Sequence, residues 1–134
     1  MPALMLEVIT PEKIVLKTEA ASVTAPGIQG YLGVLPRHAP LITPLKAGVV
    51  TYSREGSEAE RLAVSGGFLE AGADRVVILA DTAEKATDID VERARQAKER
   101  AEKRLRERPA NLDVARAEAA LQRALARLKA AGVC

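Results

Sequence analysis

The chain has 134 residues, of which 48% are hydrophobic and 28% charged, and its formal net charge is +2. This length suits one domain or two very small ones, and a composition this apolar excludes intrinsic disorder. The longest aliphatic run, residues 76–80, is far too short to cross a bilayer, so we expect a soluble protein. The single cysteine, Cys134, excludes an internal disulfide, and with no secretion signal the expected address is cytoplasmic.

The charge is unevenly distributed along the chain. Residues 1–89 hold 8 Lys and Arg against 11 Asp and Glu, a net −3, whereas residues 90–134 hold 12 against 7, a net +5. All three aromatic residues and eight of the nine glycines precede Asp88. This break predicts two structural units, which we place at residues 1–86 and 87–134.

The first unit consists of short apolar runs separated by glycine and proline, which predicts an all-β sandwich or barrel. Leu4, Leu6 and Val8 alternate with other residues, as in a half-buried strand, whereas the unalternating run 76–79 predicts a strand covered on both faces. The expected strands are residues 4–10, 13–25, 31–35, 47–54, 61–65, 68–71 and 75–80.

Few residues of the first unit suggest catalysis. His38 is the only histidine, which excludes a multi-histidine metal site, and the single cysteine excludes a cysteine-rich one. A hydrolytic triad of His38, Ser65 and Asp74 is the weakest hypothesis, because the residues before Ser65 lack the leading glycine of a nucleophile elbow. No phosphate-binding loop of the Gly-Lys-Ser/Thr type is present. We expect His38 to bond to loop backbone.

The second unit has helical periodicity. Thr87, Asp88 and Asp90 offer caps for a first helix that ends near Pro109, and Asn111 offers a cap for a second. The short connection predicts an antiparallel hairpin. The apolar positions are Val91, Ala94, Ala97 or Lys98, Ala101 and Leu105 in the first helix, and Val114, Ala117, Leu121, Leu125 and Leu128 in the second.

This hairpin should form readily and dock weakly. Its first apolar seam is mostly alanine, which buries little area per residue. Helix propensity is high, and pairs such as Glu99 with Lys103 and Glu102 with Arg106 have the favourable order along a helix. A segment that changes position needs this combination, although a permanently docked hairpin is the simpler interpretation.

Six arginines form two rows. Arg93, Arg100 and Arg104 lie within about 40° on the first helix, and Arg116, Arg123 and Arg127 align similarly on the second. Antiparallel docking would bring both rows to one edge, where a polyanion would neutralise them. The simpler interpretation is a row of snorkelling side chains on a solvated flank. A nucleic-acid-binding function is the alternative, but the tail offers no aromatic residue for base stacking.

Several sequence motifs, which follow one another along nearly the whole chain, resemble those of a known family. They are GYLGVLPRHAPL at residues 30–41, Leu45 with Gly48, VSGGFLE at 64–70 and VILA at 77–80. With the Ala- and Arg-rich hairpin that follows, the chain resembles the epsilon subunit of bacterial F-type ATP synthases. The resemblance implies an α+β protein, with an N-terminal antiparallel β-sandwich over residues 1–86 and a C-terminal two-helix hairpin over 87–134.

The resemblance also implies a function in a rotary motor. In the family the sandwich binds the gamma subunit of the central stalk and rests on the c-ring, at the cytoplasmic face of the cell membrane. The hairpin moves between a compact state on the sandwich and an extended state in the alpha/beta catalytic head. There its basic side chains face an acidic segment of a beta subunit and block ATP hydrolysis. The implied subunit is a non-catalytic regulator with no metal cofactor.

A shorter motif implies a regulatory nucleotide. Residues 89–94, Ile-Asp-Val-Glu-Arg-Ala, match the motif with which some epsilon subunits bind ATP in the compact state. The carry-over implies an ATP site formed by Glu84 and Asp90 on the base side, Arg93 beside the nucleotide, Arg100, Arg123 and Arg127 on the phosphate side, and Ile89 and Ala94 of the motif. Asp90 also has a plain interpretation as a helix cap. Gln122 replaces a basic residue of the family pattern, which bears on affinity more than on the existence of the site.

Overall fold

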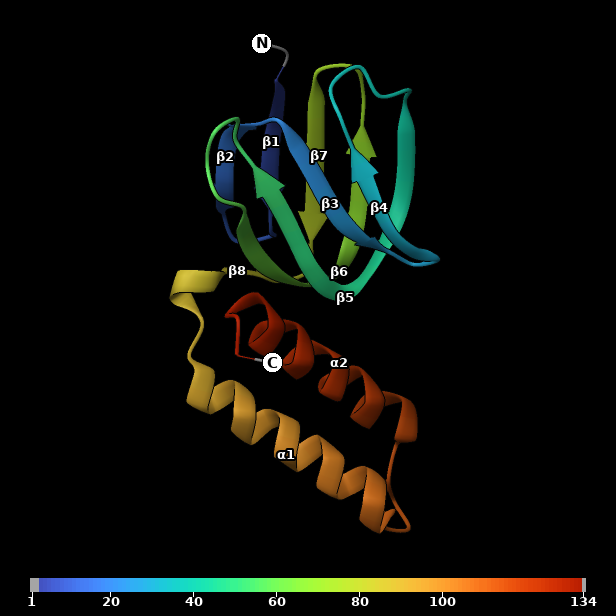
Figure 1. The fold of residues 1–134 in the computed structure, drawn as a ribbon. Coiled ribbons are helices and arrows are strands. Elements are labelled where there is room, and N and C mark those ends of the chain that lie inside the picture. Colours follow the sequence, from blue (N-terminus) through green and yellow to red (C-terminus); the bar gives the residue numbers. More distant parts are fainter. Residues whose placement is uncertain (1–2, 134) are drawn as a thin grey trace.

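The computed structural model describes residues 3–133, and Cys134 lies outside the described residues. A β-sandwich is followed by two helices packed below it (Figure 1). The strands are β1 (Leu4–Ile9), β2 (Ile14–Ala20), β3 (Ser22–Gly27), β4 (Gly30–Val34), β5 (Leu41–Ser53), β6 (Glu60–Ala71), β7 (Arg75–Ala80) and β8 (Ala83–Lys85). A short 3-10 turn η1 (Ala86–Asp88) leads to α1 (Val91–Glu107) and α2 (Val114–Ala130). The predicted α+β class, a sandwich followed by a two-helix hairpin, is confirmed.

The eight strands form one hydrogen-bonded sheet that folds over on itself. Its order is β2-β1-β7-β6-β5-β3-β4, with β8 pairing separately to β6. All pairs are antiparallel except β1 with β7, which run parallel. The sandwich therefore departs from a purely antiparallel arrangement at one pair. Because five strands intervene between β1 and β7, the connection is long enough for a parallel crossover.

The strands differ from the sequence prediction mainly in three places, beyond shifts of one residue at several ends. The expected strand 13–25 breaks at Ala21 into β2 and β3, and β5 begins at Leu41 and continues through Pro44. The expected strands 61–65 and 68–71 form one strand, β6, because Gly66 and Gly67 bend it rather than end it. Gly67 has a φ of +125°, and a Cβ there would collide with the Leu79 carbonyl oxygen. β8 was not predicted.

The core lies between the two layers and is built from large aliphatic side chains. Leu4, Leu6 and Val8 are fully buried, as their alternation predicts. The prediction that residues 76–79 are covered on both faces is wrong. Val76 and Ile78 are fully buried, whereas Leu79 is 52% exposed, because it lies on the outer face of the sheet, away from the core.

Both helices begin at aspartate caps. The Asp90 carboxylate accepts a hydrogen bond from the Arg93 N–H at 3.0 Å, which confirms the cap predicted for α1. In α2 the cap is Asp113 rather than the predicted Asn111, because the loop runs two residues further before the helix begins. Arg108 ends α1 in the left-handed conformation, with φ 44°.

The charge pairs expected along α1 do not form in the described structure. Among residues 3–133, its only intrahelical ion pair joins Arg95 to Glu92 at 3.9 Å, between two exposed side chains. Such pairs contribute little because solvent screens them. Helix propensity and packing therefore stabilise α1 more than charge pairing does.

The hairpin rests on the sandwich through α2, which lies between the sandwich and α1 (Figure 1). A small cluster of buried side chains joins the two units: Val49, Ala63, Ile89, Ala126 and Ala130. A hydrogen bond crosses the same junction, where the Nε–H of Arg61 donates to the Ala130 carbonyl at 2.9 Å. Within residues 3–133, neither helix is both long and apolar enough to span a membrane.

Candidate functional site

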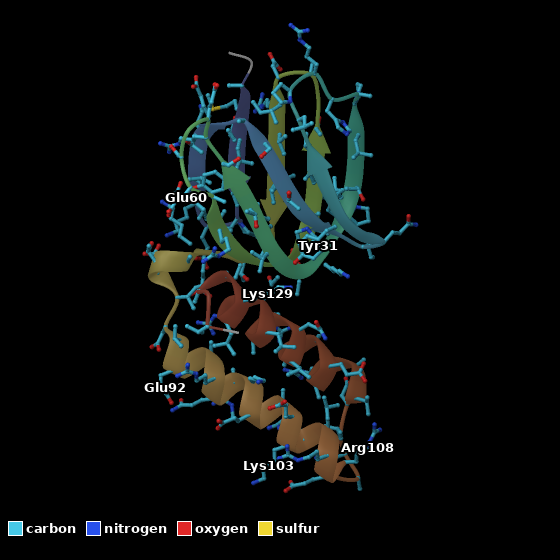
Figure 2. All side chains as sticks on the ribbon, in the orientation of Figure 1. Tyr31, Glu60, Glu92, Lys103, Arg108 and Lys129 are labelled. Carbon is cyan, nitrogen blue, oxygen red and sulfur yellow. The ribbon has the colours of Figure 1, made fainter. Side chains whose placement is uncertain are left out.

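A large open groove runs along the hairpin and reaches the edge of the sandwich. Its volume is about 1780 Å³, and its walls come from α1, α2, the turn between them, and strands β6 and β8. Figure 2 shows the hairpin densely set with polar side chains, with Lys103 and Arg108 near the turn. Polar side chains thus line a space large enough for a nucleotide-sized anion.

All six arginines of the two predicted rows line this groove: Arg93, Arg100, Arg104, Arg116, Arg123 and Arg127. Their convergence at one side of the hairpin is therefore confirmed. The antiparallel arrangement produces it, because equivalent faces of α1 and α2 meet across the alanine seam. That seam consists of the buried Ala94, Ala101, Ala117 and Ala124, and its small side chains let the helices approach closely.

One carboxylate enters the groove from the sandwich. Glu84 on β8 lies with its Oε1 2.7 Å from the Nε of Arg127, and both side chains are partly covered. The atoms are close enough for an ion pair, although the Nε–H does not point along a hydrogen bond to an acceptor. The structure therefore brings together two predicted site residues that lie 43 positions apart in the sequence.

The eight predicted ATP-site residues divide into two groups. Five line the groove: Glu84, Arg93, Arg100, Arg123 and Arg127. The other three, Ile89, Asp90 and Ala94, lie beside it at the start of α1. Ile89 packs in the junction between the hairpin and the sandwich, Ala94 is fully buried, and Asp90 caps the helix. In this conformation these three motif residues therefore position α1 rather than face the groove, whereas Arg93 of the same motif lines it.

Sequence reasoning missed several other groove residues. Ser65 and Thr82 line the sandwich end, where the Thr82 hydroxyl donates to the Ser65 Oγ at 2.7 Å, and Lys103 lines the opposite end. Lys103 lies three residues after Arg100 on the same side of α1, so the arginine row itself could have pointed to it. The sandwich residues carry no comparable sequence signal, because only the docking of the hairpin brings them to the groove. Gln122 is exposed and does not line it.

The hypothetical hydrolytic triad is not assembled. The Nδ1 of His38 lies 2.6 Å from the carbonyl oxygen of Ala39, which confirms the predicted bond to loop backbone. Ser65 bonds to Thr82 instead of His38. Residues 3–133 contain no group of three or more His, Cys, Asp or Glu side chains placed to hold a metal ion.

Comparison with known proteins identifies the family of both units. Residues 3–86 match the family described as ATP synthase, Delta/Epsilon chain, beta-sandwich domain, and residues 87–132 match its long alpha-helix domain. The chain belongs to the ATP synthase delta/epsilon chain family. The resemblance to epsilon subunits noted in the sequence is thereby confirmed.

Individual relatives agree over nearly the whole chain. The chain is 75% identical to the ATP synthase epsilon chain of Moorella thermoacetica over 132 residues, which covers 98% of each chain. It is 58% identical to that of Carboxydothermus hydrogenoformans, covering 95% of this chain and 94% of the relative. Its fold is similar to a chain in the mitochondrial ATP synthase of Euglena gracilis, a structure of OSCP, F1 and the c-ring. The TM-score is 0.83 at 25% identity, covering 98% and 82% of the two chains.

Proposed function

We propose that this chain is a central-stalk subunit of an F-type ATP synthase that couples gamma to the c-ring. Its hairpin restrains ATP hydrolysis when extended into the catalytic head, and bound ATP stabilises the docked hairpin. The observation that carries the proposal is the convergence of both arginine rows on one groove that Glu84 of the sandwich also lines. A ligand in this groove contacts parts of the chain that separate when the hairpin leaves.

An exposed apolar row on the sandwich supports the role in the stalk. The residues Ile14, Ile9, Leu79, Phe68 and Pro44 lie directly opposite one another on neighbouring strands, from β2 across to β5. Ile14, Leu79 and Phe68 are each more than half exposed. Contiguous exposed apolar surface of this kind marks interaction sites. The hairpin packs elsewhere, over Val49 and Ala63, so a protein partner has access to this apolar row while the hairpin is docked.

The apolar row can be tested by charge insertion. Phe68→Asp is expected to abolish co-purification with gamma, because binding would then desolvate a carboxylate. Thr24→Asp, at an exposed position on β3 outside the row, is the matched control. Equal gamma binding by both variants would assign the gamma contact to another surface. Circular dichroism checks that both variants keep the sandwich.

The junction between hairpin and sandwich supports reversible docking. Three of its five buried side chains are alanine or isoleucine from the hairpin side. The polar contacts between the two units are a hydrogen bond from Arg61 to the Ala130 carbonyl and the ion pair of Glu84 with Arg127. Small side chains bury little apolar area, so the free energy of docking is modest. A basic hairpin released from this surface would suit the acidic segment of a beta subunit, because opposite charges favour that contact.

The nucleotide role follows from the same geometry. Arg93, Arg100 and Arg123 make no ion pair within residues 3–133, and guanidinium groups bind phosphate through paired N–H donors. Glu84 would hold the base side from within the groove, and Asp90, whose carboxylate caps α1, would contribute from beside it. ATP acts here as a regulatory ligand rather than a substrate, since the sequence carries no phosphate loop. The ligand shifts the hairpin only by its differential affinity for the docked state.

Isothermal titration of ATP into the full chain tests the nucleotide site. We expect heat of binding with the parent chain and a loss of about tenfold or more in affinity with Arg93→Ala, which removes one charge-assisted phosphate contact. Asp90→Ala tests the base side. Arg95→Ala, at an exposed position on α1 that does not line the groove, is the matched control. Absence of binding heat with the parent chain would refute the proposed nucleotide site.

The inhibitory role is tested separately in the assembled catalytic complex. ATP hydrolysis is compared between complexes with the full chain and with a chain ending after Thr87. We expect faster hydrolysis without the hairpin. Equal rates would refute inhibition while leaving the stalk role intact.

A further inference from the structure

The groove extends beyond the residues that are proposed to bind ATP. Across the antiparallel hairpin, the arginines fall at three successive levels: Arg93 with Arg127 is the proximal level, Arg100 with Arg123 the middle level, and Arg104 with Arg116 the distal level. From Arg93 to Arg104 the helix rises about 16 Å at 1.5 Å per residue. The ladder of positive charge thus runs from the sandwich almost to the turn.

The distal level, Arg104 with Arg116, contains the two groove arginines that are not among the proposed ATP-binding residues. Lys103 and Asn111 line the groove beside it, and two acids also lie there, Glu107 and Asp113. The Asp113 carboxylate accepts the backbone N–H of Arg116 as the α2 cap, so one of its oxygens is already engaged. Among residues 3–133, no ion pair involves Lys103, Arg104 or Arg116, whereas Arg127 at the proximal level has Glu84.

We infer that the distal level is a further phosphate-binding subsite, so the groove takes a linear polyphosphate chain longer than a triphosphate. Repeating guanidinium levels match a repeating anion, and arginine binds phosphate with paired donors. None of the described residues lining the groove is aromatic, so a single-stranded nucleic acid has no base-stacking platform there. The inference rests on the proposed function only in assigning the triphosphate to the proximal and middle levels.

The chain could come from two sources, either free inorganic polyphosphate or a phosphate chain attached to adenosine. Four probes separate them: tripolyphosphate, a longer linear polyphosphate, ATP and adenosine tetraphosphate. Each is titrated into the full chain at fixed salt. We expect the longer polyphosphate to bind more tightly than tripolyphosphate, and adenosine tetraphosphate more tightly than ATP, because only the longer chains reach the distal level.

Two double variants locate the contact. Arg104→Gln with Arg116→Gln removes the distal level and is expected to weaken binding of the longer polyphosphate by about tenfold or more, with a smaller loss for ATP. Arg95→Gln with Arg106→Gln removes the same charge from exposed positions of α1 that do not line the groove. We expect this control to bind as the parent does. Arg104→Lys with Arg116→Lys keeps the charge and should restore most of the affinity, while circular dichroism checks the helices.

Several results would overturn the inference. They are equal losses in the two glutamine variants, equal binding of short and long chains, or equally tight binding of polyglutamate, which would indicate an acidic protein segment instead. Binding of ATP without any preference for longer chains refutes the distal subsite and leaves the nucleotide site standing. Binding of long polyphosphate without binding of ATP refutes the nucleotide site and supports the distal subsite.

Discussion

The sandwich and the hairpin are stabilised by different kinds of side chain. The largest fully buried residues of the molecule, among them Leu4, Leu6, Leu62, Leu69 and Ile78, all lie in the sandwich. In the helices the buried residues are alanines with the single exception of Leu128. A buried leucine contributes about 1.5–3 kcal/mol and an alanine much less. The sandwich is thus a well-packed scaffold, and the hairpin is an arm docked on it through small side chains, which is the arrangement that the proposed release of the hairpin requires.

The largest expected effect is in the scaffold. Leu69→Ala is expected to lower the free energy of unfolding of the sandwich by about 2–5 kcal/mol, because it leaves a cavity at a fully buried position. Urea denaturation followed by sandwich fluorescence or circular dichroism measures it. Leu79→Ala, at a half-exposed position on β7, is the control and should cost under about 1 kcal/mol. An equal loss of unfolding free energy in both variants would contradict the placement of Leu69 in the core and Leu79 on the surface.

The next prediction concerns whether the hairpin can detach without unfolding the sandwich. Ala126→Asp places a carboxylate against Val49 and Ala63, where an unpaired charge costs several kcal/mol, so the hairpin is expected to undock. The free energy of unfolding of the sandwich should stay within about 0.5 kcal/mol of the parent value. Ala119→Asp, exposed on the same helix, should leave the hairpin docked. If Ala126→Asp unfolds the sandwich as well, the two units are one cooperative structure.

A third effect is confined to the scaffold and depends on pH. Burial, followed by the hydrogen bond and charge of Glu60, raises the pKa of Tyr52 to about 12. The folded state therefore favours the protonated phenol, so this stability is present below pH 10 and is lost as pH rises from 10 to 12. At pH 11 the loss is about 1 kcal/mol. Unfolding curves of the parent chain and Tyr52→Phe should diverge between pH 10 and 12. Parallel curves would contradict the assignment.

The smallest effect concerns the polar contact of the arm. Arg61→Gln removes the hydrogen bond to the Ala130 carbonyl at the end of α2 and is expected to weaken docking by about 1 kcal/mol, since Arg61 is largely exposed. The population of docked hairpin, measured by the distance between labels, reports it. Lys46→Gln, an exposed cation on β5, is the control. An unchanged docked population would leave the alanine contacts and the Glu84–Arg127 ion pair to hold the hairpin on the sandwich.

Much of this comparison could be predicted from the sequence, because it depends on local patterns. Periodicity predicts the two helices, the alanine seam and the alignment of the arginine rows, and alternation predicts the burial of Leu4, Leu6 and Val8. Strand boundaries were less predictable, since Gly66 and Gly67 bend β6 where glycine elsewhere ends a strand. The exposure of Leu79 depends on what covers β7, which no local pattern encodes.

The candidate site was predictable in part for the same reason. The arginines belong to helical rows and could be aligned by spacing, whereas the contact of Glu84 with Arg127 needs the hairpin to dock. The motif residues Ile89 and Ala94 were expected in the ATP site, but both are buried beside the groove. Their roles in packing depend on tertiary structure, which spacing along the chain does not contain.

The central claim is that a ligand in the arginine groove holds the arm on the scaffold. The direct measurement is the distance between spin labels at Ser57, in the exposed β5–β6 turn, and Ala110, in the hairpin turn, in the full chain with and without ATP. At a hundred times its dissociation constant, ATP that binds only the docked state favours it by about 2.7 kcal/mol. We predict a larger docked population with ATP in the parent chain and no change in Arg100→Gln with Arg123→Gln. A docked population that ATP leaves unchanged in the parent chain would contradict the account.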